Sequence, residues 1–222
     1  MAPSLPLGPL TLALIVTKPG QRRFRESSRE SQILSRRIPF GMKKKNSRSQ
    51  GEGLEKVRRI DEGGALRAVI ETPRGSRNKY SHDSKENVFL LKKVLPAGMT
   101  FPYDFGYIPN TKAEDGDPID ILVLMDDPAF PGCVAQVRLV GVIEIEEKEQ
   151  GKSVRNDRLI AVAVSSHTYR EIKDIRDMGH AFIEDLEKFF ETYQKLDGKE
   201  IRLLGCKGPN RAQKLMEQSL AA

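Results

Sequence analysis

One stretch organises the chain: Glu114-Asp115-Gly116-Asp117-Pro118-Ile119-Asp120, which runs directly into the apolar segment Ile121-Leu122-Val123-Leu124. Four carboxylates lie within these first seven positions, and like charges this close repel one another, so a cation is their natural counterpart. Pro118 fixes its own φ angle and Gly116 permits a left-handed turn, so we expect a rigid loop that enters a strand. Hard oxygen ligands of this kind favour Mg²⁺ or Mn²⁺.

The strand predicted after this loop has two distinct faces, because successive side chains alternate. One face carries Asp120, Leu122 and Leu124, and the other carries Ile119, Ile121 and Val123. An acid at the head of an otherwise apolar face is expected to point into a cleft or into the mouth of a barrel. The alternative is a solvated acidic turn before a strand.

Positive charge is concentrated at the N-terminal end of the 222-residue chain. Residues 1–50 contain eleven Lys or Arg against two Glu, a net charge of +9, whereas the whole chain carries +6. The remaining residues therefore sum to −3, so a nucleic-acid-binding function inferred from the charge of the whole chain would be misplaced. The composition divides the chain into a basic tail over residues 1–54 and a folded domain over residues 55–222.

The tail is rich in Arg, Ser and Lys and has no sustained apolar period, so it is expected to be disordered. Three other interpretations are open: an organelle transit peptide, a basic arm that touches nucleic acid, and an untranslated leader included by a wrong start codon. Met42 is the start that the last interpretation favours. Residues 5–16 are apolar but broken by two prolines and too short to span a bilayer, so no membrane segment is predicted.

Short apolar segments separated by turn residues predict a mostly β domain completed by helices. Strands are expected over residues 65–71, 87–94, 134–147 with a bend at Gly141, 159–164 and 201–204, and a polar loop over residues 74–80. Apolar residues at spacings of three and four predict a helix over residues 180–193, and a last helix is expected over residues 210–220. Strands that each place charge at one end suggest a small closed barrel with a polar mouth.

The cysteines and histidines do not indicate a metal or disulfide framework. Cys133 and Cys206 are the two cysteines, and two thiols in a chain of this size fit a reducing compartment. We therefore expect a cytoplasmic protein, or one that the tail directs to an organelle if the host is eukaryotic.

Several motifs in order along residues 68–205 carry a resemblance to a known family. They are Val69-Ile70-Glu71-x-Pro73, Asn78-Lys79-Tyr80, Phe101-Pro102-Tyr103-Asp104-Phe105-Gly106-Tyr107, Asp115-Gly116-Asp117-Pro118-x-Asp120, Val140-Gly141-Val142 and Phe189-Phe190-x-x-Tyr193. Together they resemble the soluble family I inorganic pyrophosphatases. The resemblance implies an α+β, mostly β fold with a five-stranded OB-like closed barrel flanked by two or more helices. It also implies a homo-oligomeric hydrolase that splits pyrophosphate into two phosphates with Mg²⁺, or with Mn²⁺ in its place.

The resemblance assigns roles to individual residues. Asp117 matches the base that helps to deprotonate the attacking water, and Asp115 and Asp120 match bridging metal ligands. Further metal-ligand positions are matched by Glu71, Glu147, Asn156 and Asp157. Phosphate-contacting positions are matched by Lys79, Lys93, Arg158 and Tyr193. This set agrees with the substrate, because attack on pyrophosphate needs cations that neutralise its oxygens.

The chain departs from the family pattern around this central set. Ser81 stands where the family has Glu, Phe105 where it has Tyr, Lys93 where it has Arg, and Gln194 where it has Lys. Glu147, or Glu146 in the other register, is nearest to a further metal-binding Asp. In Asn156-Asp157-Arg158, either Asn156 replaces a carboxylate or Asp157 shifts in to serve. The departures predict a divergent subfamily with altered metal occupancy.

The alternative from another class is a noncatalytic OB-fold protein that binds phosphate or nucleic acid. Such a nucleic-acid face should carry aromatics that alternate with Lys or Arg on exposed strands. The clearest strands end in acids instead, which repel phosphates unless metals intervene. Nucleic acid is therefore not expected as a partner of the folded domain.

Overall fold

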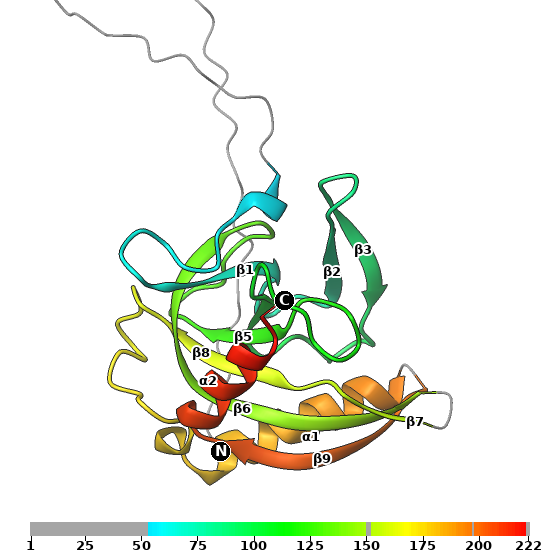
Figure 1. Ribbon diagram of the computed structural model, residues 1–222. Coiled ribbons are helices and arrows are strands. Elements are labelled where there is room, and N and C mark those ends of the chain that lie inside the picture. Colours follow the sequence, from blue (N-terminus) through cyan, green and yellow to red (C-terminus); the bar gives the residue numbers. More distant parts are fainter. Residues whose placement is uncertain (1–52, 150–151, 197, 221–222) are drawn as a thin grey trace, which may run out of the picture. The chain divides into compact units, whose positions relative to one another are not determined.

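The computed structural model describes residues 53–149, 152–196 and 198–220 (Figure 1). The basic tail predicted over residues 1–54 therefore lies outside the described residues, apart from its last two positions. The strands are β1 (Leu66–Thr72), β2 (Asn78–Asp83), β3 (Val88–Val94), β4 (Asp104–Tyr107), β5 (Asp120–Leu124), β6 (Val134–Glu149), β7 (Lys152–Arg155), β8 (Arg158–Ala163) and β9 (Glu200–Lys207). The helices are α1 (His180–Leu196), α2 (Pro209–Gln218) and the short 3-10 turns η1 (Leu54–Lys56) and η2 (Ile175–Met178).

Five strands pair in a ring. β1 pairs with β4 on one side and with β6 on the other, and the pairs β4–β5, β5–β8 and β8–β6 complete the ring. The β5–β8 pair is parallel, and the other four pairs are antiparallel. β7 and β9 extend the sheet from the long strand β6, while β2 and β3 form a separate two-stranded sheet (Figure 1).

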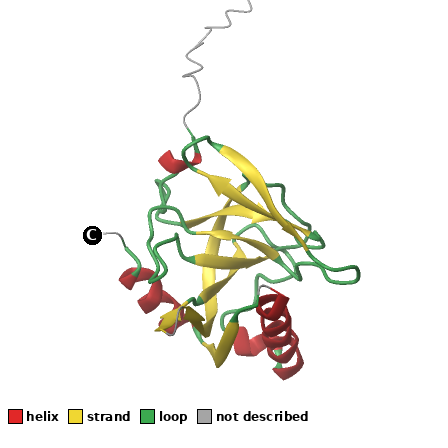
Figure 2. Ribbon diagram, turned by 90° about the vertical axis from the view of Figure 1, so that its right-hand side faces the viewer, coloured by secondary structure: helices red, strands yellow, loops and turns green. Residues whose placement is uncertain are grey.

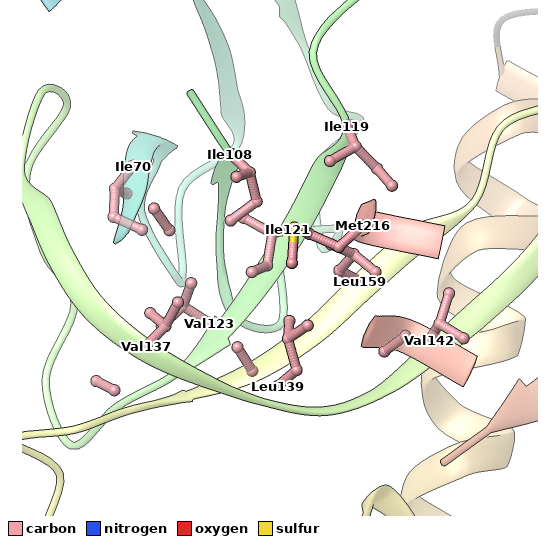
Figure 3. Close-up of a cluster of buried hydrophobic side chains, with 14 residues drawn as sticks. Ile70, Ile108, Ile119, Ile121, Val123, Val137, Leu139, Val142, Leu159 and Met216 are labelled. Carbon is pink, nitrogen blue, oxygen red and sulfur yellow. The ribbon is translucent and has the colours of Figure 1, made fainter. Parts of the chain in front are cut away.

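The two faces of β5 enter two different hydrophobic clusters, as the alternation of its residues predicts. Ile121 and Val123 join one cluster with side chains of β1, β6, β8 and Met216 of α2, and Figure 3 shows these side chains pointing toward one another. Leu122 and Leu124 join the second cluster, which α1 covers with Leu186, Phe190 and Tyr193. The apolar strand is therefore buried on both sides, and only its acidic head is left beside solvent.

Both α-helices lie outside the strands (Figure 2). α1 packs on β9 and α2 packs on β6. None of the helices in the described part of the chain is long and apolar enough to cross a bilayer.

The six strands and two helices predicted from the sequence pattern are present, with ends that differ by at most three residues. The polar loop expected over residues 74–80 is wrong in its second half, because Asn78 begins strand β2. Two short strands lie in segments with no predicted strand: β4, within the aromatic motif, and β7, within a hydrophilic stretch. The strands β2, β4 and β7 are each polar or short. Each becomes a strand because a paired strand supplies its backbone hydrogen bonds.

Two glycines mark close approaches of the backbone. A Cβ atom at Gly106 of β4 would lie 1.9 Å from the carbonyl oxygen of Val69 in β1, so this pairing requires glycine. At Gly141 a Cβ atom would lie 2.7 Å from the side chain of Ile175, and the register of β6 against β8 shifts between Leu139 and Gly141. This irregularity stands at the bend that the sequence predicts.

Candidate active site

A cavity of about 680 Å³ opens between the β2–β3 hairpin, the loop before β5, the start of β8 and the end of α1. Eight of the eleven site residues predicted from the sequence line it: Glu71, Lys79, Asp115, Asp117, Asp120, Asn156, Arg158 and Tyr193. Lys93, Glu147 and Asp157 do not line it. The fold therefore brings together acids and cations that lie up to 122 positions apart in the sequence.

One wall of the cavity is the acidic loop, residues 114–120. The turn is tight, because the Gly116 N–H donates to the Ala113 carbonyl at 3.1 Å and Gly116 has a φ of 95°. The Asp117 N–H donates to Asp115 Oδ1 at 3.1 Å, which fixes one carboxylate against the next backbone unit. Asp120, the first residue of β5, faces the same cavity. The tight turn at Gly116 and the inward-facing acid predicted from the sequence are both found.

Burial disfavours the charged form of these acids. Burial raises the pKa of Asp120 above its ordinary value despite the opposing charges of Arg158 and Lys79. It also raises the pKa of Asp115, and the charge of Asp120 adds to that shift. Burial likewise raises the pKa of Glu71, although the His82 N–H donates to its Oε1 at 2.7 Å. A cation at this wall would relieve the cost of ionising all three.

The acidic loop has the donor chemistry of a Mg²⁺ site, since its ligands are carboxylate oxygens alone. In the described part of the chain, however, no group of three or more His, Cys, Asp or Glu side chains is arranged around a single metal position. The loop therefore fits a hard divalent cation by the chemistry of its carboxylates alone.

The cavity also has a cationic wall, to which Lys79 belongs, while Lys93 lies beside that wall without lining the cavity. Lys79 of β2 and Lys93 of β3 are direct partners in the hairpin, an arrangement that repulsion disfavours unless an anion is close. The Lys79 ammonium lies 4.3 Å from the centre of the Phe105 ring, and the Lys93 ammonium lies 3.6 Å from the centre of the Tyr193 ring. The aromatic faces hold both charges in place.

Arg158 joins the two walls. It begins β8 directly opposite Asp120 in the parallel β5–β8 register, and its Nη2 lies 3.7 Å from Asp120 Oδ2. The residue is only 3% exposed, yet its Nε is a buried side-chain nitrogen with no hydrogen-bond partner among the described residues. A buried donor left unpaired is costly, so this nitrogen is a candidate donor to a bound anion.

Glu147 lies beside the cavity in a group that we name the Glu147 corner: Glu147, Asn156, Arg158, Gln194 and Lys199. Its side chain is 2% exposed. Glu147 Oε1 accepts from Asn156 Nδ2 at 2.8 Å and from Gln194 Nε2, while Oε2 accepts from Lys199 Nζ at 2.7 Å. Arg158 Nη2 lies 3.5 Å from Oε1. Both carboxylate oxygens of Glu147 are therefore bound by protein donors.

Asp157 has a different environment from its neighbour Asn156. Its carboxylate accepts from Arg155 Nη2 at 2.8 and 2.9 Å and from the Ile145 N–H at 2.9 Å. Asn156, one position earlier, lines the cavity. Of the two arrangements that the sequence left open, the structure places the amide in the cavity and turns the carboxylate away.

Most of the chain matches a known protein family. The family model described as inorganic pyrophosphatase matches residues 68–222. The chain belongs to the inorganic pyrophosphatase family. This confirms the family that the motifs predict.

Individual inorganic pyrophosphatases agree over most of the folded part. The chain is 35% identical to the inorganic pyrophosphatase of Synechocystis sp. over 165 residues, which are 74% of this chain and 95% of that one. It is 36% identical to the enzyme of Geobacillus stearothermophilus over 156 residues, 70% of this chain and 92% of the relative. The crystal structure of inorganic pyrophosphatase from Thermus thermophilus matches with a TM-score of 0.69 and 34% identity, covering 76% of this chain and 97% of that one.

Some cavity residues of this pyrophosphatase family member were not found from the sequence. Lys199, His82, Lys92, Asn110 and Leu54 all line the cavity. Lys92 is the neighbour of the predicted Lys93, so the pair of adjacent lysines could have indicated that either one lines the cavity. Lys199 follows α1 in an ordinary polar turn, and nothing in its local pattern links it to Glu147, which lies 52 positions earlier.

Proposed function

We propose that the chain hydrolyses inorganic pyrophosphate to two phosphates with Mg²⁺, which Mn²⁺ can replace. The observation that carries the proposal is the presence of both an acidic wall and a cationic wall in one cavity. A pyrophosphate bridged by divalent cations needs both walls, because the metals require carboxylates and the phosphate oxygens require donors.

Asp115, Asp120 and Glu71 would hold the metal at the acidic wall. When bound, divalent cations neutralise phosphate oxygens and lower the pKa of water. Asp117 lies in the same loop and is the candidate base. It takes a proton from the water whose oxygen attacks one phosphorus atom, and the bridging oxygen leaves with the second phosphate.

The cationic residues orient the substrate. Lys79, Lys93 and Arg158 neutralise its charge, and the Tyr193 ring holds the Lys93 ammonium in place. Arg158 lines the cavity and brings a guanidinium charge to it. Lys93 offers a single point of charge where the family resemblance has a forked guanidinium, so we expect weaker orientation there.

The decisive experiment is phosphate release from pyrophosphate by the full chain at graded Mg²⁺, with Mn²⁺ as a second metal. Metal-dependent turnover is expected, and Asp117→Asn should reduce it by about 10²–10⁴-fold, the usual contribution of a general base. Asp127→Asn is the matched control, since Asp127 is an exposed acid in the loop after β5. No release at any level of either metal would overturn the proposal.

We further propose that the ring of five strands is an OB-like closed barrel and that residues 55–222 form the catalytic domain. The closed pattern of strand pairings supports the first point. Deletion of residues 1–50 tests the second, and activity should survive it. A large loss would mean that the tail contributes to the folded enzyme.

A homo-oligomeric state and a cytoplasmic location are also proposed from the family resemblance. Light scattering after size-exclusion chromatography would give the mass of the protein in solution. A monomeric mass would contradict the homo-oligomeric state.

A further inference from the structure

Glu147 is a buried carboxylate whose neighbours carry more positive charge than it can neutralise. Lys199 and Arg158 both lie within 4 Å of its oxygens, and Arg158 Nη2 also lies 3.7 Å from Asp120 Oδ2, so the Glu147 corner holds two positive charges and one negative charge of its own. The acidic loop has the reverse balance, with Asp115, Asp117 and Asp120 gathered at one wall. The two ends of the same cavity therefore differ in sign.

The oxygens of Glu147 are also poorly placed to receive a metal ion. A carboxylate offers about four lone-pair positions, and here two amide donors, an ammonium and a guanidinium surround them. A divalent cation at this point would have to displace the Lys199 ammonium and would then lie beside the Arg158 guanidinium. Repulsion from the remaining cation opposes that exchange.

The corner lacks the second carboxylate that a divalent cation would need. Asn156, which lines the cavity, is neutral, and its Nδ2 donates to Glu147. Asp157 points toward Arg155 instead. Gln194, which stands where the family resemblance has Lys, is 2% exposed and also donates to Glu147. Both amide side chains beside Glu147 therefore act as donors to it.

We propose that the Glu147 corner is a phosphate subsite built from protein cations, in which the Lys199 ammonium takes the place of a metal ion. This inference rests on the proposed function for its substrate. Lys199 is about one-third exposed and lines the cavity, so its ammonium can meet a phosphate oxygen while Glu147 holds it in place. Arg158 also lines the cavity, and its Nε has no hydrogen-bond partner among the described residues. The chain then binds metal at the acidic loop but not at Glu147.

Counting bound metal separates this arrangement from a metal site at Glu147. The full chain, stripped with EDTA, is titrated with Mn²⁺ in the absence of substrate, and bound ions per chain are measured by calorimetry and by the electron paramagnetic resonance of free Mn²⁺. Glu147→Gln is expected to keep the wild-type number of ions, whereas Asp120→Asn in the acidic loop is expected to lower the number or the affinity. Loss of one ion per chain in Glu147→Gln would overturn the proposal.

A gain of metal provides a second test that does not depend on the stability of Glu147→Gln. The double variant Asn156→Asp, Lys199→Met removes the ammonium and adds a carboxylate, so it should bind one Mn²⁺ more than the wild type. Lys195→Met is the matched control, because Lys195 lies on the exposed face of α1 and pairs with Glu191. An unchanged count in the double variant would contradict the proposal.

Substrate binding completes the test. Lys199→Met should raise the KM for pyrophosphate by about tenfold or more, the usual effect of removing a hydrogen bond to a charged group, and Lys199→Arg should restore most of it. An unchanged KM would overturn the role of Lys199 as a phosphate donor. Absence of hydrolysis in the wild type would overturn the proposed function alone, because the Mn²⁺ counts still decide what occupies the Glu147 corner.

Discussion

The acidic loop and the Glu147 corner are two carboxylate groups beside one cavity, and they differ in what surrounds them. Asp115 is exposed and Asp120 is partly exposed, each near other acids, and desolvation together with that like charge raises their pKa values. Glu147 is more deeply buried, yet amides and cations bind both of its oxygens. A carboxylate at the position of a metal ligand is therefore not by itself a metal site. The charge of the neighbouring side chains decides whether a carboxylate can bind a metal ion or is already paired with a protein cation.

The largest expected effect is on the stability of the Glu147 corner. Glu147→Gln leaves Lys199 and Arg158 close together without their shared anion, and breaking a buried ion pair in this way costs about 3–5 kcal/mol. Chemical denaturation in EDTA should show this loss. Glu146→Gln, on the less buried neighbour, is the control and should change little. If Glu147→Gln were as stable as the wild type, the Glu147 corner would not differ from the acidic loop in the pairing of its carboxylate.

The next largest effect is expected on catalysis, from a substitution in the acidic loop. Asp120→Asn should lower phosphate release by at least about 100-fold, because even residues that only support metal ligands contribute 10–100-fold. Circular dichroism should report an intact fold. Activity within a few-fold of the wild type would mean that Asp120 holds no essential metal, and Asp127→Asn again serves as the control.

A smaller effect is expected at the cationic wall. Lys79→Gln should raise the KM for pyrophosphate by about tenfold, since it removes one charged donor while the others remain. Lys85→Gln, at the exposed turn of the same hairpin, controls for a change in the charge of β2–β3. If both variants behave alike, long-range charge and not contact explains the effect.

The smallest expected effect is a change in stability at Asp120, and its sign is opposite to the one expected at Glu147. Without metal, Asp120→Asn should stabilise the protein at neutral pH by about 1 kcal/mol, or about 2–4 °C in melting temperature for a domain of this size. The folded-state pKa of Asp120 is raised, so its contribution to stability is full below the unfolded pKa and is lost as pH rises through the folded pKa.

Melting curves in EDTA across pH check this prediction. The wild type and Asp120→Asn should be nearly equal in acid and should diverge as the pH rises toward neutrality, with the variant the more stable. A variant that is less stable at neutral pH would show that the Asp120–Arg158 ion pair outweighs the burial of the carboxylate.

Much of the fold follows from local pattern. The alternation in β5 predicted its two apolar faces, and spacings of three and four predicted α1. β2 was not predicted, because its residues are polar and half-buried and its strand structure depends on β3 as a partner. Local propensity cannot supply that information, since pairing decides whether a polar segment is extended.

The sequence by itself determined the acidic loop: Gly116 and Pro118 restrict the backbone, and the crowding of Asp115, Asp117 and Asp120 favours a cation. The tertiary structure decided the rest of the cavity. The parallel β5–β8 register sets Arg158 beside Asp120, and one step along the chain separates Asn156 in the cavity from Asp157 turned away from it. Lys199 reaches Glu147 only because β9 pairs with β6. Contacts between residues so distant in sequence arise from strand pairing, which no local pattern encodes.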